Sequence, residues 1–179
     1  MLQNCSILKI ADVFFNEPTK THYLMEISRK SKIAHTSVKN YLIELKKNKI
    51  INEEIEKRGE RKFPGYKANL NEQTYKSYKC ICNKEKILDS GLIEQMRDKI
   101  MPKSIILFGS FSRGEDIETS DIDLFIESKK QEINLDKFEK ILKRKIQLHF
   151  NENFNNYPKE LKNNIINGEI LYGYLEVFK

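Results

Sequence analysis

Residues 104–127 read SIILFGSFSRGEDIETSDIDLFIE and contain two short apolar segments separated by glycines and polar residues. The first segment, residues 105–108, has the length of one buried strand. Gly109 follows at once, and a glycine there lets the backbone come close to a ligand. The second segment, residues 121–127, has apolar side chains at every second position, as in a strand. The stretch therefore predicts a strand, a turn and a second strand.

The second predicted strand would divide its side chains between two faces. The core face would carry Ile122, Leu124 and Ile126. The opposite face would carry Asp121, Asp123, Phe125 and Glu127. Two carboxylates two residues apart on one face repel each other unless a cation lies between them. Their oxygens suit Mg²⁺ (or Mn²⁺), which commonly bridges to the phosphates of a substrate.

Gly109 and Ser110 can offer backbone N–H groups and a hydroxyl to a phosphate, especially where a helix begins. A phosphate-binding turn that faces a metal-binding pair of carboxylates predicts a nucleoside-triphosphate site. The alternative is a strand edge with solvated aspartates after a tight turn, which leaves the pairing of the two halves unexplained.

The pair Gly109-Ser110, ten intervening residues and Asp121-x-Asp123 resemble the signature of the DNA polymerase β-like nucleotidyltransferase superfamily, particularly its minimal branch. The resemblance covers residues 88–179 and implies a small mixed-sheet α/β domain. It implies that Asp121 and Asp123 are catalytic and hold the metal. It also implies that a nucleoside triphosphate, with ATP expected, is bound by Gly109, Ser110 and Arg113.

The resemblance implies that a hydroxyl attacks the α-phosphate of the nucleotide and releases pyrophosphate. The minimal branch includes antitoxins that modify tyrosines of a partner HEPN toxin, so a HEPN-type protein is one class of acceptor. RNA, DNA and small molecules are others.

The chain departs from the superfamily pattern at the third carboxylate, which active members generally carry on the strand beside the Asp-x-Asp strand. Here that strand is predicted at residues 145–150, KIQLHF, and the matching position is Gln147, which brings no charge. His149 on the same face is either a ligand or proton acceptor, or a half-buried structural residue. Glu127 is a candidate substitute. We therefore expect nucleotide binding to survive better than turnover.

Residues 1–70 predict a second kind of domain. Apolar periodicity predicts helices over residues 6–15 and 23–30, and a third that begins at His35 or Thr36. Strands near residues 50–55 and 66–70 would flank a basic loop, KRGERKFPG. This order resembles the winged helix-turn-helix domain of archaeal and bacterial transcription regulators.

That resemblance implies a set of nucleic-acid contacts. Major-groove contacts would come from Thr36, Ser37, Lys39 and Asn40, and contacts to the phosphates or the minor groove from Arg58, Arg61 and Lys62. The distribution of charge favours an anionic partner for this part of the chain. Residues 1–86 carry 18 Lys and Arg and 10 Asp and Glu, whereas residues 87–179 carry 14 Lys and Arg and 16 Asp and Glu. The alternatives are a dimerisation or protein-docking module, with lysines that only solvate the surface.

The remaining segments complete the predicted organisation. Residues 71–87 are polar and rich in lysine, and would link the two domains as a helix or an extended connector. Helices are expected at residues 90–100, after Asn134, with Ile141 in its buried stripe, and from Asn155 or Asn156. The tail over residues 170–178 would pack on the core or on a second subunit, as in a homodimer.

Composition adds further expectations. Cys5, Cys80 and Cys82 cannot all pair, and Cys80 and Cys82 are too close in sequence for an ordinary disulfide or a complete zinc site, so reduced thiols are expected. Apolar runs fall short of a membrane span and the N-terminus lacks a signal-peptide layout, so a cytoplasmic location is expected.

The sequence thus predicts an α+β protein in which a winged helix precedes a nucleotidyltransferase domain. The predicted function is Mg²⁺-dependent transfer of a nucleoside monophosphate, coupled to nucleic-acid binding. The alternative is a catalytically weak or inactive DNA-binding transcriptional regulator.

Overall fold

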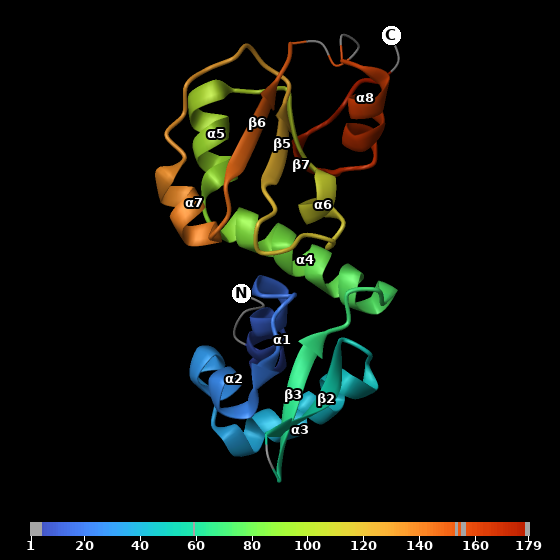
Figure 1. The fold of residues 1–179 in the computed structure, drawn as a ribbon. Helices are drawn as coiled ribbons and strands as arrows, with labels where there is room; N and C mark the ends of the chain where they lie inside the picture. The colour runs from blue at the N-terminus through green and yellow to red at the C-terminus, as the bar shows by residue number, and fades with distance from the viewer. Residues whose placement is uncertain (1–4, 59, 153, 155–156, 178–179) are drawn as a thin grey trace. The chain divides into compact units, whose positions relative to one another are not determined.

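The computed structural model describes residues 5–58, 60–152, 154 and 157–177 (Figure 1). The chain divides into two compact units, Met1–Lys79 and Cys80–Lys179. The division falls inside helix α4 (Gln73–Asp89), in the segment that the sequence predicts as a connector. The predicted domain bounds themselves stay a prediction. Within the described ranges, no helix is both long enough and apolar enough to span a membrane.

The first unit begins with three helices, α1 (Ser6–Asn16), α2 (Leu24–Ser31) and α3 (His35–Lys47). Each turns an apolar stripe inward, as the helical spacing of the sequence predicts. The core of this unit includes the fully buried side chains of Ile10, Phe14, Ile27, Val38 and Leu42. Lys32 ends α2 in the left-handed conformation (φ 58°), which makes the turn towards α3 tight.

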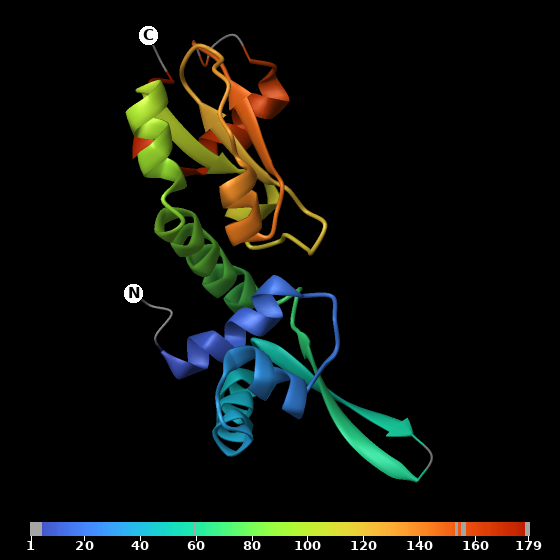
Figure 2. The ribbon, with the colours of Figure 1, turned by 90° about the vertical axis from the view of Figure 1, so that its left-hand side faces the viewer.

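The same unit contains a three-stranded antiparallel sheet in the order β1-β3-β2. Its strands are β1 (His22–Tyr23), β2 (Ile51–Arg58) and β3 (Arg61–Ala68). The loop predicted over residues 57–65 is wrong, because pairing continues to the tip of the hairpin, where Lys57 faces Lys62. Side chains near the tip are exposed, so their charge does not interrupt the backbone ladder. Figure 2 shows this hairpin extending beyond the three helices of its unit.

The second unit contains a four-stranded mixed sheet in the order β6-β5-β4-β7. Its strands are β4 (Ser104–Phe108), β5 (Ile122–Ile126), β6 (Ile146–Phe150) and β7 (Glu169–Gly173). Strands β5 and β6 are parallel, and the other neighbours are antiparallel. The small mixed sheet agrees with the predicted fold. Strand β7 pairs with β4, so this part of the tail completes the sheet of its own chain; Phe178 lies outside the described residues.

Helices cover both faces of this sheet (Figure 1). On one face lie the end of α4, α5 (Leu92–Ile100) and α7 (Asp136–Leu142), packed on Ile105, Leu107 and the inward residues of β5. On the other face lies α8 (Lys159–Ile166), whose Ile165 belongs to a cluster with Phe108 and Phe125. The buried positions Ile122, Leu124 and Ile126 confirm the predicted core face of β5.

Three expectations about this unit need correction or lie outside the structure. Phe125 was assigned to the face of the aspartates, and it does lie there, but it is fully buried because α8 and Phe154 cover it. Ile141 was expected in a buried stripe, yet its side chain is 52% exposed. Helix α8 follows Pro158, and the predicted starts at Asn155 or Asn156 lie outside the described residues.

Phe125→Ala should lower the free energy of unfolding by about 3–5 kcal/mol, because it leaves a cavity under α8. Ile141→Ala serves as the control and should change it by no more than about 0.5 kcal/mol, since this side chain is largely in water. Urea denaturation followed by circular dichroism measures both. Equal losses in the two variants would contradict the two-sided packing of the sheet.

Candidate active site

The turn after β4 lies directly against an aspartate of β5. Phe108, the last residue of β4, is paired with Asp123 across the ladder. Gly109 then begins the short helix α6 (Gly109–Ser112) with φ +78°. A Cβ atom on Gly109 would lie 2.6 Å from Oδ2 of Asp123, so a larger residue would force this carboxylate to shift, and the positive φ also favours glycine. The two halves of the sequence pattern are therefore neighbours in space.

Strand β6 brings one polar side chain to each aspartate. The amide Nε2 of Gln147 donates to Oδ2 of Asp121 at 2.5 Å. The imidazole Nε2 of His149 lies 3.3 Å from Oδ1 of Asp123. A half-turn of the Gln147 amide would present its carbonyl oxygen instead, which is a neutral metal ligand. The parallel pairing of β5 with β6 is what aligns these side chains with the acidic pair.

His149 combines two of the roles that the sequence left open. Its side chain is 29% exposed and its ring packs edge-on against Phe108, with the centroids 5.1 Å apart. At the same time its Nε2 contacts Asp123. The residue is therefore half-buried and structural, and it also stands within reach of any group that Asp123 binds.

Glu127 cannot replace the missing third carboxylate. It is buried, and its Oε2 accepts a hydrogen bond from the Ser104 hydroxyl at 3.2 Å. Ser104 begins β4, whereas Gly109 follows the end of that strand, so Glu127 lies at the opposite end from the aspartates. The strand alternation was assigned correctly, but the advance of about 3.3 Å per residue carries Glu127 out of reach.

The remaining predicted nucleotide-binding residues lie in and just after α6. Ser110 is half-buried, and its carbonyl accepts the N–H groups of Arg113 and Glu115, which close the turn. The exposed Arg113 donates from Nε to Glu115 Oε2 at 2.9 Å. Arg113 would have to leave this pair to reach a phosphate, and exposed ion pairs of this kind are weak.

A buried polar network holds the loop between α6 and β5. Asn83 of α4 donates from Nδ2 to the carbonyl of Phe111 at 2.9 Å and to Oδ1 of Asp116 at 2.8 Å. Arg144 approaches Oδ2 of Asp116 at 3.8 Å, and both side chains are buried. Buried charges are stable only when paired, so this network limits the positions open to the loop that leads to Asp121.

Sequence reasoning missed this network because its members are far apart in the chain. The signal present in the sequence is the buried stripe of α4, in which Tyr75, Lys79, Asn83 and Ile87 recur every four residues. Two members are polar, which hides the stripe from a search for apolar periodicity. Other apolar side chains of this helix lie outside the stripe, since Tyr78 and Ile81 are about half exposed.

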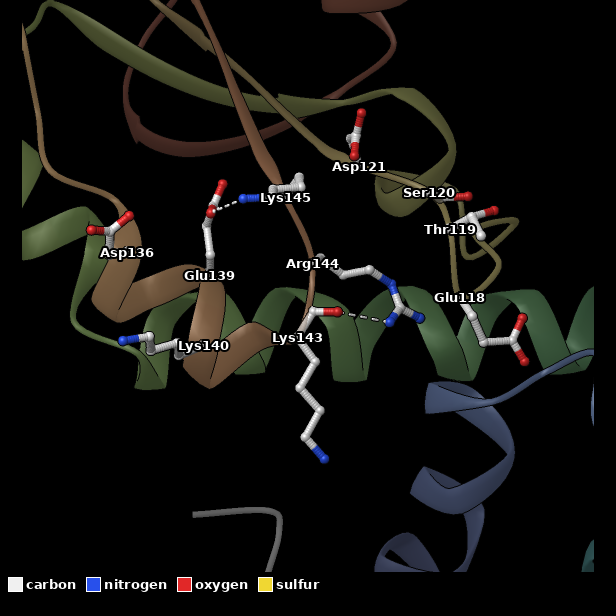
Figure 3. Close-up of a pocket in the computed structure, with 10 residues that line it drawn as sticks. All are labelled: Glu118, Thr119, Ser120, Asp121, Asp136, Glu139, Lys140, Lys143, Arg144 and Lys145. Atoms are coloured by element: carbon white, nitrogen blue, oxygen red, sulfur yellow. Dashed lines mark hydrogen bonds and ion pairs between the residues drawn. The ribbon is translucent and has the colours of Figure 1, made fainter.

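A pocket of about 610 Å³ opens beside Asp121 (Figure 3). Lys145 donates to Glu139 Oε2 at 2.8 Å, and Arg144 donates to the carbonyl of Lys143 at 3.1 Å. The bond from Lys145 lowers the pKa of the Glu139 carboxyl. The lining comprises Glu118, Thr119, Ser120, Asp121, Asp136, Glu139, Lys140, Lys143, Arg144 and Lys145. The pocket beside Asp121 is thus lined by both acidic and basic side chains.

The predicted nucleic-acid contacts lie on the first unit. The predicted contacts of α3 are exposed and lie on either side of the buried Val38; they are Thr36, Ser37, Lys39 and Asn40. Lys62 is exposed near the tip of the β2–β3 hairpin. The backbones of Arg58 and Arg61 pair with each other, but their side chains lie outside the described part of the chain.

Comparison with known proteins shows which class of domain the second unit resembles. Residues 90–172 match the family model described as "Nucleotidyltransferase domain". This part of the chain is therefore similar to nucleotidyltransferase domains, in agreement with the resemblance, and a transferase activity is supported at the level of that family. No curated protein and no solved structure matched the chain.

Gly109→Ala should abolish divalent-cation binding at the aspartates, because the added methyl group pushes against the Asp123 carboxylate. Gly91→Ala is the matched control, since Gly91 has almost the same backbone angle (φ +77°) and nothing within 4 Å of its Cβ position. Both variants should lose about 1–2 kcal/mol of stability from the backbone conformation. Only Gly109→Ala should also lose Mn²⁺ binding measured by electron paramagnetic resonance, and retained binding would contradict the proposed contact.

Proposed function

We propose that the second unit transfers a nucleoside monophosphate from a Mg²⁺-bound nucleoside triphosphate, with ATP expected, to a hydroxyl acceptor. The observation that carries this proposal is the contact between the Gly109 turn and the Asp123 carboxylate, inside a domain that matches the nucleotidyltransferase family. The contact supports the proposal because it would bring the backbone proposed to bind phosphate and the carboxylate proposed to hold the cation within one ligand's reach.

The donor set at this point fits a hard divalent cation. Asp121 and Asp123 offer carboxylate oxygens and Gln147 an amide oxygen after rotation, which are the ligand types that Mg²⁺ prefers. Asp121 and Asp123 would hold the ion, which when bound neutralises charge on the phosphates and polarises the phosphorus centre. Mn²⁺ fits the same oxygens.

The chain's own residues would bind and orient the nucleotide. The N–H groups of Gly109 and Ser110 belong to the first turn of α6, where a helix leaves such groups without intrahelical partners. They and the Ser110 hydroxyl would hold the terminal phosphates, with Arg113 as an added contact once it leaves Glu115. The acceptor oxygen then bonds to the α-phosphorus, the α–β phosphoanhydride bond breaks, and pyrophosphate leaves.

The acceptor would approach through the pocket beside Asp121, which opens to the same carboxylate and is wide enough for a ribose or a tyrosine side chain. RNA, DNA and a protein such as a HEPN-type partner are the acceptor classes to compare. The proposed winged helix would bring nucleic acid to the chain through α3 and the hairpin, whose predicted contacts are exposed where the structure describes them.

A second candidate function is nucleotide-dependent regulation of a DNA-binding module. The specific observation in its favour is Gln147, whose uncharged amide occupies the position beside Asp121 where a third carboxylate is expected. With less charge to hold a second metal, the site would bind nucleotide without efficient turnover.

Asp121→Asn should weaken binding of Mg²⁺-ATP at least tenfold, because it removes one of two anionic ligands; a tenfold change corresponds to about 1.4 kcal/mol. Isothermal titration calorimetry with and without Mg²⁺ measures the effect. Asp98→Asn makes the same charge change at an exposed position of α5 and should leave binding unaltered. Failure of the intact protein to bind Mg²⁺-nucleotide would overturn both candidate functions.

The same preparation separates the two functions. Incubation with triphosphates labelled at the α-phosphate, and with RNA, DNA and cell-extract protein in parallel, should label one acceptor if the domain is a transferase. Binding without any labelled acceptor, together with a nucleotide-dependent change in DNA affinity, would favour the regulator.

Lys62→Gln should weaken nucleic-acid binding to a similar extent for all sequences and reduce the slope of log affinity against log salt by about 1, because one phosphate contact is lost. Lys67→Gln is the control on the same hairpin, since Lys67 already pairs with Glu54 at 2.8 Å. Fluorescence anisotropy over a salt series measures both variants. The contact would be refuted by equal slopes in the two variants.

A further inference from the structure

A second cluster of potential ligands lies in the first unit, whereas the proposed nucleotide site belongs to the second. Glu17 follows α1, His22 lies in β1, and Glu26 lies in the first turn of α2. One ligand atom from each of these three residues lies within 4.8 Å of the others. The Nδ1 atom of His22 is 3.6 Å from Oε1 of Glu26 and 3.8 Å from Oε2 of Glu17.

The hydrogen bond of His22 determines which ring nitrogen carries its proton. Nε2 lies 3.1 Å from the backbone carbonyl oxygen of Glu17, which can only accept, so Nε2 bears the hydrogen. The ring is fully buried and packs edge-on against Phe14, with the centroids 5.2 Å apart. A histidine that donates one ring N–H to a backbone carbonyl has the arrangement typical of a metal ligand.

The other nitrogen, Nδ1, is buried and has no hydrogen-bond partner among the described residues. In neutral imidazole it carries a lone pair that points towards two carboxylates. Lys20 and Lys30 pair with these carboxylates, but Nδ1 itself stays without a partner, because the carboxylate oxygens lie 3.6 and 3.8 Å away, beyond a good hydrogen-bond distance. A metal ion would satisfy Nδ1 and both carboxylates together.

The separations of the atoms agree better with a metal. Bonds of about 2.1 Å in a tetrahedral site separate neighbouring ligand atoms by roughly 3.4 Å. The observed separations of 3.6 and 3.8 Å from Nδ1 are close to this value, and the ligand atoms of the two glutamates lie within 4.8 Å of each other. One nitrogen and two oxygen ligands suit Zn²⁺ or a similar transition metal better than Mg²⁺, which prefers oxygen alone.

Two lysines compete for the same carboxylates. Lys20 lies 2.7 Å from Oε1 of Glu26, and Lys30 lies 2.9 Å from the same oxygen and also pairs with Glu17. The hydrogen bond from Lys30 lowers the pKa of Glu17. Burial alone would raise the pKa of Glu26, but bonds from Lys20 and Lys30 outweigh it and bring it to about 2. Both carboxylates are therefore ionised at neutral pH.

The lysines can leave, whereas the histidine cannot. The side chains of Lys20 and Lys30 are 50% and 33% exposed, so each can turn into water and give up a weak ion pair. His22 is held by Phe14 and by the Glu17 carbonyl. A metal would therefore gain the buried nitrogen and displace the mobile ammonium groups.

We propose that Glu17, His22 and Glu26 bind a divalent transition metal, with Zn²⁺ the best chemical fit, and leave a fourth position open. Bound metal joins the end of α1 to the start of α2, and thus stabilises the unit that carries α3 and the hairpin. This site is independent of the nucleotide site, since its ligands all belong to the other unit.

The test uses the full chain with Asp121→Asn and Asp123→Asn, which silences the nucleotide site. Zn²⁺ is titrated by calorimetry, and Co²⁺ by its visible absorption spectrum. One equivalent should bind, and His22→Gln or Glu26→Gln should weaken binding by at least about tenfold. Glu54→Gln is the control, because it removes an exposed carboxylate of the same unit whose partner is Lys67.

A second variant, expected to bind Zn²⁺ more tightly, keeps the test conclusive even if His22→Gln does not fold. Lys20→Gln removes a competitor from an exposed position and should tighten Zn²⁺ binding and increase the rise in melting temperature that Zn²⁺ produces. Binding that persists in both His22→Gln and Glu26→Gln, as expected for the free cysteines, would overturn the proposal. So would the absence of binding, which would identify the cluster as an ion-pair network.

Discussion

The main constraint on the second unit is the repulsion between the carboxylates of Asp121 and Asp123, which the fold holds close to the turn at Gly109. Asp121 and Asp123 flank the first residue of β5, and Gly109 lies so near Asp123 that an added Cβ atom would displace the carboxylate. In the structure an amide and an imidazole from β6 face this charge. A cation with a polyphosphate would relieve the same repulsion more fully, which is the physical basis for the proposed nucleotide site.

The parallel pairing of β5 with β6 is the topological feature that brings polar partners to Asp121 and Asp123. Parallel neighbours need a crossover connection, and here α7 makes it while it buries Phe138 and Leu142 on the sheet. The crossover returns the chain at the pocket beside Asp121, with Arg144 next to the buried Asp116. One connection therefore completes the core, supplies the partners of the aspartates and anchors the loop before them.

The first unit handles its charges in a different way. Its exposed residues on α3 and near the hairpin tip would face the proposed anionic partner, whereas Glu17, His22 and Glu26 gather charge where α1, β1 and α2 meet. There the imidazole is fully buried, whereas the side chains of Lys20 and Lys30 are partly exposed. Such a difference in exposure is what would let an external cation displace an internal one.

The sequence by itself determined the features that depend on local periodicity and on residue type. A short apolar run located β4, alternating apolar residues located the core face of β5, and helical spacing located α1, α2, α3 and α5. The Gly109-Ser110 and Asp121-x-Asp123 pattern indicated the class of domain. These signals are readable because each residue's direction follows from its neighbours in a strand or a helix.

Only the tertiary structure decided which polar residues meet and which faces are covered. Asn83, Asp116 and Arg144 are separated by dozens of residues, and Glu127 shares a strand face with Asp123 yet lies at the wrong end of the sheet. Phe125 is buried because α8 packs on it, and Ile141 is exposed although Phe138 and Leu142 of the same helix are buried. The physical reason is that burial and ionic partnership are properties of packed surfaces, which a local pattern does not contain.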